Sequence, residues 1–259
     1  MKNILLLLVL STYLSTNKDG QTQNTAIATI EYNLDITWDG LMQRKVIVNC
    51  TKSKSLSKTV EKKVFEGKRI DKNTETIHIN QKLDEEYQLT DNEKKTVTVY
   101  SFIQNQDYKF IEESPMMLWK LSKKGETKKI DNFVCNKATL TFRGRNYIAW
   151  YCPKIPLSFG PWKFKGLPGL ILEIADDENH YHWIVSKLVY PSNNISNINI
   201  PESKNVKEIS FKQFVDKEES IKNAMLAKIL KLLPRGAIAD KGNNKRRSIE
   251  LVYDWEKKK

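Results

Sequence analysis

The sequence has few of the residues from which enzyme and metal sites are usually built. Its 259 residues include three histidines, three cysteines and ten glycines. It has no Ser–His–Asp order, no glycine-rich phosphate loop and no zinc-protease helix motif, so the corresponding enzyme classes find no support. No apolar run is long enough to span a bilayer. We therefore predict a protein without a transmembrane segment and without a cofactor.

The charge balance is strongly basic. Lys and Arg number 43 against 31 Asp and Glu, which gives a formal net charge of +12 and a pI of about 9.4. Nucleic acid, anionic lipid and acidic glycan are the partners that such a charge suits. Lysine and glutamate are mixed along most of the chain, which is equally typical of a solubilising surface.

The N-terminus has the pattern of a secretory signal. A basic residue, Lys2, precedes an unbroken apolar run from Ile4 to Leu10, which is too short to cross a bilayer. Cleavage is expected between Ser11 and Ala26, and we place the signal peptide at residues 1–22 and one β domain at residues 23–259. No cysteine directly follows the run, so a lipid anchor is not predicted. We expect an exported protein of the periplasm, envelope or medium, and no nucleic-acid partner.

Export makes the three cysteines informative, because thiols tend to pair in an oxidising compartment. Cys135 and Cys152 each lie beside a strand of one predicted hairpin, so we expect these two to form a disulfide. Cys50 is then left over, either buried or as a free thiol. No His–Asn or His–Asp arrangement can be tied to Cys50, which argues against a catalytic thiol.

Short strands dominate the predicted secondary structure. Residues 31–38 alternate strictly between apolar and polar side chains, as a half-buried strand does. Residues 52–73 are rich in Lys, Ser and Glu and predict a loop or edge hairpin. Further strands are predicted at residues 45–49, 77–79, 96–103, 108–111, 116–121, 139–142, 147–151, 170–175 and 181–189, with a weak last strand at 249–253. This spacing predicts a mainly β fold: a curved antiparallel sheet or bowl-like half-barrel.

One helix is predicted near the C-terminus. Apolar residues recur there at helical spacing, with Lys and Glu between them, from Phe211 to Leu233. The sequence Pro234-Arg235-Gly236 ends the helix. We expect the helix to cover part of the concave face of the sheet and to leave an apolar cavity beside it.

The central feature is a loop followed by a buried strand. Residues 160–169 combine three glycines and two prolines with two aromatic residues, and residues 170–174 are an apolar strand. Glycine permits positive φ and proline fixes φ, so the loop is expected to be rigid. Trp162 and Phe164 in this loop either form an exposed recognition tip or pin the loop onto the sheet.

Six residues of this stretch carry a resemblance to a known family. They are Gly166, Leu167, Pro168, Gly169, Leu170 and Ile171, and they are preceded by Gly160-Pro161-Trp162-Lys163-Phe164. Further matching residues are Trp119, Lys128-Lys129-Ile130, Cys135-Asn136-Lys137-Ala138, Phe142-Arg143-Gly144-Arg145, Ala149-Trp150-Tyr151 and Ile155-Pro156. On these motifs the chain resembles the GLPGLI family of exported Bacteroidetes-type proteins, which have no assigned activity. The resemblance covers about residues 115–190, and many family members have Thr where this chain has Cys152.

The resemblance also implies a fold. The family looks similar to the bowl-like N-terminal domain of a bacterial peptide-N-glycosidase and to the half-open barrels of envelope lipoprotein carriers. Both are likenesses of fold and imply no function.

The strongest candidate binding residues surround a tight turn. Arg143 and Arg145 flank Gly144, with Tyr147 and Trp150 close by in the sequence. Arginine suits a carboxylate or phosphate and aromatic rings offer stacking faces, so these residues, with Trp162 and Phe164, are a candidate site for an anionic head group or a sugar. The alternative is structural: Arg145 pairs inside the fold and Trp150 belongs to the core.

A metal site has weaker support. His180 and His182 are two residues apart on a predicted strand, so their side chains are expected on one face, near the acidic turn Asp176-Asp177-Glu178. Two histidines in a turn also fit a solvated hairpin end, and we predict no metal site. Glu173 lies in an apolar strand, either as an acid with a raised pKa or on the solvent side of the sheet.

These observations favour a non-catalytic protein. We expect it to bind an apolar or amphiphilic ligand, or a partner polypeptide, in a concave β-sheet, with Arg143 and Arg145 holding an anionic end. The alternative is a metal- or carboxylate-dependent hydrolase of peptides or glycans that uses His180, His182 and nearby acids. A third possibility is docking of an envelope protein on exposed sheet edges.

Overall fold

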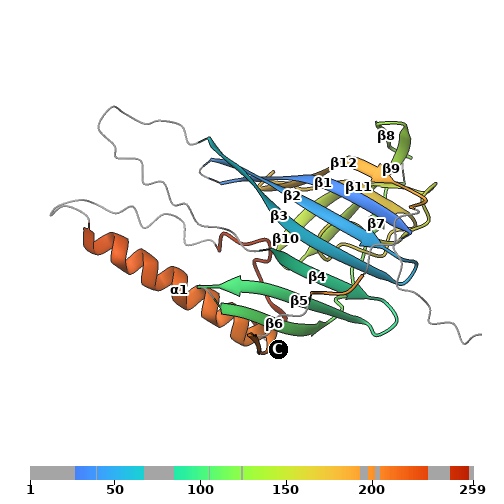
Figure 1. Ribbon diagram of the computed structural model, residues 1–259. Coiled ribbons are helices and arrows are strands. Elements are labelled where there is room, and N and C mark those ends of the chain that lie inside the picture. The colour runs from blue at the N-terminus through green and yellow to red at the C-terminus, as the bar shows by residue number, and fades with distance from the viewer. Residues whose placement is uncertain are drawn as a thin grey trace, which may run out of the picture.

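The computed structural model describes residues 27–38, 40–66, 85–104, 106–123, 125–192, 198–201, 205–232 and 246–256. Its described strands form one 13-stranded sheet that is not closed, and one α-helix follows near the C-terminus (Figure 1). The predicted fold class is therefore confirmed. The predicted signal peptide and the predicted strand at 77–79 lie outside the described residues.

The strands are β1 (Ala28–Thr37), β2 (Leu41–Cys50), β3 (Lys54–Glu66), β4 (Glu86–Asp91), β5 (Thr96–Ile103), β6 (Gln106–Glu113), β7 (Lys120–Leu121), β8 (Thr127–Ile130), β9 (Phe133–Phe142), β10 (Arg145–Cys152), β11 (Leu170–Asp176), β12 (Tyr181–Val189) and β13 (Val206–Glu208). Their spatial order is β13-β6-β5-β4-β3-β2-β1-β12-β11-β10-β9-β7, and β8 also pairs with β9. The β13–β6 pair is parallel. The long-range pair β1–β12 joins the N-terminal strands to the hairpins of the central region.

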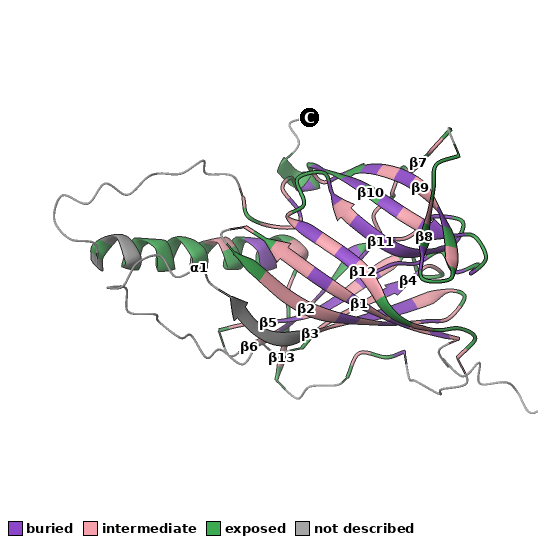
Figure 2. Cartoon of the chain, turned by 90° about the horizontal axis from the view of Figure 1, so that it is seen from above, coloured by how far each residue is buried: buried purple, intermediate pink, exposed green. Residues whose placement is uncertain are grey.

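Alternating side chains give β1, β2, β9, β10 and β12 one apolar face, which we call the inner face, whereas β11 between them is buried on both faces. In β1 the buried members are Ala28, Ile30, Tyr32 and Leu34, while the residues between them are half-buried. Figure 2 shows this alternation along the strands. The hydroxyl of Tyr32 donates a 2.6 Å hydrogen bond to the carbonyl of Ile171, so β1 is fixed to the strand that follows the central loop.

The prediction of a loop or edge hairpin at 52–73 was wrong for the part of this range that the structure describes, while residues 67–73 lie outside the described residues. Lys54–Glu66 is a 13-residue strand that pairs with β2, and its residues 54–59 also pair with β4 on the other side. Sheet hydrogen bonds are made by the backbone, so a strand rich in Lys and Ser is still held when both neighbours are present. Its serines Ser55 and Ser57 are buried, which apolar patterning could not reveal.

Two other strand predictions were also wrong: one strand is much shorter than predicted, and the other is not a strand. Of residues 116–121, only Lys120–Leu121 is a strand; the residues before it cross from β6 to β9 without sheet pairing. Along this crossing Met117 and Trp119 pack on the core, and Met116 and Leu118 face out. Residues 249–253 form no strand and lead into a short 3-10 helix, Asp254–Glu256.

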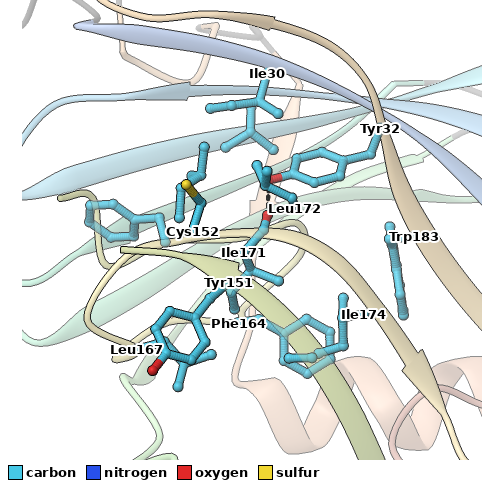
Figure 3. Close-up of a cluster of buried hydrophobic side chains, with 14 of the residues drawn as sticks. Ile30, Tyr32, Tyr151, Cys152, Phe164, Leu167, Ile171, Leu172, Ile174 and Trp183 are labelled. Carbon is cyan, nitrogen blue, oxygen red and sulfur yellow. Dashed lines mark hydrogen bonds between the residues drawn. The ribbon is translucent and has the colours of Figure 1, made fainter. Parts of the chain in front are cut away.

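The central loop packs onto the inner face. Phe159, Phe164 and Leu167 are at most 1% exposed and belong to the same core cluster as Tyr32, Ile174 and Trp183 (Figure 3). Phe164 is therefore a core residue, and Trp162 is half-buried beside it. Side chains of the loop therefore cover this part of the inner face.

The glycines of the loop explain how it turns so tightly. Gly166 and Gly169 have φ of 95° and 153°, a region that side chains with Cβ rarely adopt. A Cβ on Gly169 would lie 2.3 Å from the carbonyl oxygen of Cys152, so the loop approaches β10 more closely than any other residue type permits.

The helix α1 (Phe211–Leu232) begins at a reciprocal cap. The Gln213 amide donates to Ser210 Oγ at 3.2 Å, and the Ser210 amide donates to Gln213 Oε1 at 2.8 Å. Phe211 and Phe214 then stack against Phe110 of β6. This confirms the predicted helix, although only its first turns are packed on the sheet. No helix among the described residues has the length and apolarity needed to cross a bilayer.

Candidate functional site

The C-terminal segment, residues 246–256, lies along the turn between β9 and β10. The amides of Leu251 and Val252 both donate to the carbonyl oxygen of Arg143, at 2.9 and 3.1 Å. A Cβ on Gly144 would lie 3.0 Å from Leu251 and 3.1 Å from Val252, so the segment is in close contact with the turn. The predicted turn therefore holds a bent, non-helical stretch of the same chain, residues 248–253.

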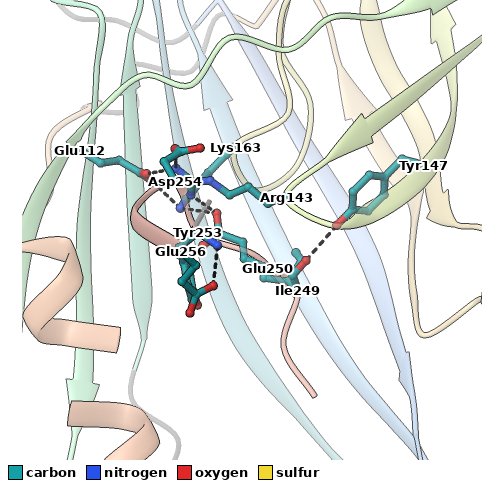
Figure 4. A network of polar contacts seen from close by, with 9 residues as sticks. All are labelled: Glu112, Arg143, Tyr147, Lys163, Ile249, Glu250, Tyr253, Asp254 and Glu256. Carbon is teal, nitrogen blue, oxygen red and sulfur yellow. Dashed lines mark hydrogen bonds and ion pairs between the residues drawn. The ribbon is translucent and has the colours of Figure 1, made fainter. Parts of the chain in front are cut away.

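Two more of the predicted site residues bind the backbone of this segment. The guanidinium of Arg145 donates to the carbonyl of Ser248 through Nη2 at 2.9 Å and Nε at 3.2 Å. The hydroxyl of Tyr147 donates to the carbonyl of Ile249 at 3.1 Å (Figure 4). Because backbone carbonyls accept these bonds, this part of the contact binds the peptide backbone irrespective of its side chains.

A buried group of four charges holds the centre of the segment. Glu250 contacts both Arg143 and Lys163, and Glu112 of β6 contacts the same two cations. None of the four side chains is more than 6% exposed. Two positive and two negative charges balance, as burial demands. Burial opposes the charge of Arg143, but the carboxylates of Glu250 and Glu112 raise its pKa above the ordinary value.

Aromatic rings surround these cations. The ammonium of Lys163 lies 5.1 Å from the Trp162 ring centre and 4.8 Å from that of Phe211. The guanidinium of Arg143 lies 5.2 Å from the same Phe211 ring. Cation–π attraction is strongest where water is excluded, so the rings help the buried charges to be tolerated.

The backbone of the site is strained at two places. Arg143 has φ of 43° and Trp162 has φ of 52°, both in the left-handed region. Such conformations cost roughly 1–3 kcal/mol each and persist where the surroundings fix them. Here the surroundings are the ion pairs of Arg143 and the packing of Trp162 against Phe142 and Phe164.

Arg145 also pairs inside the fold. Its Nη1 lies 2.8 Å from Asp176 Oδ2, with side-chain exposures of 2% and 0%. The guanidinium packs between the rings of Trp38 and Tyr181, at 5.3 and 5.1 Å. Both arginines are thus engaged by carboxylates of this chain, and an added anion would have to replace one of them.

The structure brings together most of the predicted binding residues, but Trp150 lies elsewhere. It is on the outer face of β10, where the ammonium groups of Lys128 and Lys137 lie 5.8 and 6.0 Å from its ring centre. Sequence reasoning missed Glu112, Lys163 and Glu250. The only available signal was a lysine between two aromatics in a rigid loop, and nothing linked it to positions far away in the sequence.

The two histidines do not converge. His182 Nε2 lies 3.2 Å from Glu173 Oε1 on the outer face, whereas His180 stacks on Trp38 with ring centres 3.8 Å apart. Burial would raise the pKa of Glu173, but hydrogen bonds from His182 and Lys128 hold it below the ordinary value. Glu173 is therefore an ionised, paired carboxylate and not an acid with a raised pKa.

His180 does lie close to two carboxylates. Ligand atoms of Asp176, Glu178 and His180 are all within 4.8 Å of one another. The Arg145 guanidinium shares Oδ2 of Asp176 with this group and lies 3.8 Å from Glu178. A fixed positive charge at this position disfavours a metal cation, because like charges repel strongly at such short range.

All three cysteines are buried thiols. Tyr151 of β10 pairs with Asn136 of β9, and antiparallel pairing advances in opposite directions along the two strands. Cys152 therefore lies opposite Cys135. Burial raises the pKa of the Cys135 thiol to about 12, and the nearby Cys152 adds to this effect.

Comparison with sequence families matches the part of the site that lies on β10 and the central loop. Residues 143–173 match the sequence model of a family described as a protein of unknown function (Porph_ging). The match includes Arg143, Arg145, Lys163 and the motif from Gly166 to Ile171. No curated protein matches this chain.

Solved structures share the fold at low identity. PNGF-II in its P21 crystal form superposes with a TM-score of 0.51 and 16% identity over 73% of this chain and 33% of that one. Its C2 form gives a TM-score of 0.47 and 17% identity over 73% and 32%. An uncharacterised conserved protein from Thermus thermophilus gives 0.37 and 10% over 72% and 93%. The chain spans about a third of the length of PNGF-II, and the likeness is one of fold alone.

Proposed function

We propose that this chain is an exported, non-catalytic protein that binds a partner polypeptide at the site described above. We call this the peptide site and define it by Glu112, Arg143, Arg145, Tyr147 and Lys163. The observation that carries the proposal is that these residues bind a peptide through its backbone and one carboxylate, namely the chain's own C-terminal segment.

The contacts suit a polypeptide better than a small apolar ligand. The inner face beside the site is filled by loop side chains such as Phe159, Phe164 and Leu167. The polar contacts, in contrast, are made to successive backbone groups and to one carboxylate. The partner segment would therefore adopt a similar bent backbone and would carry an acidic residue in place of Glu250.

A partner must compete with the resident segment. A tethered segment has an effective concentration of the order of millimolar, so an incoming peptide binds only if its contacts are better or if the resident segment is displaced. The property to test is therefore the exchange of the resident segment for an added peptide. The experiment cuts the chain between α1 and the segment and leaves every contact of the segment in place.

A recognition sequence for a specific protease, placed between α1 and residue 246, allows the segment to be cut from the folded protein. We expect an isotope-labelled peptide of residues 246–259 to replace the severed segment, as followed by native mass spectrometry. A peptide with Asp254→Asn is the matched control, because Asp254 is 64% exposed and lies 3.5 Å from Arg143. The Asp254→Asn peptide should replace the severed segment as the native peptide does, whereas a peptide with Glu250→Gln should not replace it. A severed segment that never exchanges would show that the contact is only structural.

Export and family membership complete the proposal. The signal-like N-terminus supports export, and the motif from Gly166 to Ile171 within the matched region supports a GLPGLI-type protein. In the oxidising compartment, Cys135 and Cys152 would form a cross-strand disulfide, which their opposed positions support. Mass determination of the mature protein tests export and oxidation together.

A second candidate is a hydrolase, favoured by one observation. The Glu173 carboxylate orients His182 on the open outer face, which is how a general base is positioned. If this candidate is correct, His182→Gln abolishes hydrolysis of a peptide or glycan substrate while the peptide exchange above is unchanged. If no hydrolysis depends on His182, the candidate fails.

A further inference from the structure

The two halves of α1 differ in how they are packed. Phe214 and Val215 in the first half are buried, and Glu219 pairs with Arg246 at 2.5 Å. From Lys222 onward, every described side chain of the helix is exposed, including Met225 at 54% and Leu226 at 53%. Figures 1 and 2 show this half extending beyond the sheet. We call residues 221–232 the distal helix.

The distal helix also differs in charge. It contains three lysines, Lys222, Lys228 and Lys231, and no acidic residue, whereas Asp216, Glu218 and Glu219 all lie in the first half. Its sequence, Ile-Lys-Asn-Ala-Met-Leu-Ala-Lys-Ile-Leu-Lys-Leu, is therefore both apolar and purely cationic. Such a combination differs from a solubilising surface helix, in which both signs of charge alternate.

The distal helix continues the packed first turns of α1 but lacks tertiary packing along its own described side chains. Isolated helices shorter than about 12–15 residues are marginal in water, and tertiary packing normally stabilises them. Among the described residues nothing covers the distal helix beyond Ile221. A partner that covers Met225 and Leu226 and is complementary to three lysines would supply the missing contacts.

We propose that the distal helix docks on the surface of an anionic lipid bilayer. Basic amphipathic helices lie in the plane of such surfaces, with apolar side chains at the boundary of the acyl chains and lysines at the headgroups. Each lysine near an anionic surface strengthens binding by roughly five-fold. The formal net charge of +12 acts in the same direction. This inference does not depend on the peptide site.

The test is flotation of the full-length mature protein with lipid vesicles. Vesicles of phosphatidylcholine with phosphatidylglycerol should bind the protein, and pure phosphatidylcholine should not. The charge variant Lys222→Gln/Lys228→Gln/Lys231→Gln should lose about two orders of magnitude in affinity. Met225→Ser/Leu226→Ser should also lose binding. The matched control Met116→Ser/Leu118→Ser removes apolar residues that are 81% and 73% exposed outside the helix, and should bind normally.

Three results would overturn the proposal. The protein could fail to bind anionic vesicles, or the helix variants could bind as well as the wild type. Alternatively, light scattering could reveal a dimer that dissociates in the Met225→Ser/Leu226→Ser variant, which would make a second copy the occupant. All substituted side chains are exposed, so circular dichroism should report the same sheet content in each variant.

Discussion

Lys163 donates a 3.0 Å hydrogen bond to Glu250, although the two residues are 87 positions apart. The lysine belongs to the central loop and the glutamate to the C-terminal segment. Both side chains are almost fully buried, at 3% and 6% exposure. The central loop and the segment in the peptide site are therefore parts of one electrostatic unit.

Replacing Glu250 should destabilise the fold strongly. Glu250→Gln leaves Arg143 and Lys163 with Glu112 as their one buried carboxylate, and an uncompensated buried charge costs about 3–5 kcal/mol. Urea denaturation of the purified variant measures this loss in the free energy of unfolding.

The matched control for this change is Glu208→Gln. Glu208 pairs with Lys109 at 2.8 Å, but its side chain is 74% exposed, so the change should cost less than about 1 kcal/mol. Equal losses in the free energy of unfolding for Glu250→Gln and Glu208→Gln would show that the buried group of four charges stabilises the fold no more than an exposed ion pair does.

Gly169→Ala should disrupt the central loop. The added methyl group would meet the Cys152 carbonyl oxygen at 2.3 Å, and the residue would keep a positive φ of 153°. We expect a loss of about 3 kcal/mol or more in the free energy of unfolding, or failure to fold. Gly40→Ala is the control, because nothing lies within 4 Å of its Cβ position, and its effect should stay within about 1 kcal/mol. Normal stability of Gly169→Ala would refute a rigid loop.

Oxidation should join Cys135 to Cys152 and leave Cys50 as a thiol. Alkylation of the denatured exported protein should then add one group, and reduction beforehand should raise this to three. The disulfide should stabilise the fold by about 3 kcal/mol, seen as a higher urea midpoint without reductant. In Cys152→Ser the reductant should have no effect. Three alkyl groups on the unreduced exported protein would contradict the pairing.

Stability at acidic pH should depend on Glu173. Hydrogen bonds from His182 and Lys128 lower its pKa despite burial, so its ionised form stabilises the folded state above the unfolded pKa of about 4.3. That contribution disappears as the pH falls through the lowered pKa. Between about pH 5 and pH 3, the wild type should lose more stability than Glu173→Gln. Parallel pH profiles of the two proteins would show that the pair contributes nothing.

The strands with clear alternation could be predicted from the sequence, and others could not. Thr96–Ile103 has the predicted boundaries because buried and half-buried residues alternate along it. Lys54–Glu66 was missed because backbone hydrogen bonds to β2, and over residues 54–59 also to β4, hold it without an apolar face. Residues 249–253 resemble a strand in composition, but side chains of β10, and not a neighbouring strand, bind the carbonyls of Ser248 and Ile249.

The site was predictable only in part. Arg143, Arg145 and Tyr147 could be nominated because arginines and aromatics gather at one turn. The carboxylates that pair with the site could not be predicted. Glu250 and Glu112 come from distant segments, and in the sequence they look like ordinary surface acids. Ion pairs between distant segments depend on the topology of the fold, so the spacing of residues in the sequence does not predict them.

The most direct test of the peptide site is the affinity of the severed protein for its own segment. The resident segment is first cut and separated from the protein. Fluorescence anisotropy of a labelled peptide of residues 246–259 then measures the affinity of the empty site. We predict saturable binding, weakened at least roughly ten-fold by Glu250→Gln in the peptide and unchanged by Asp254→Asn. Equal affinity of the native and Glu250→Gln peptides, or no binding of either, would contradict the peptide site.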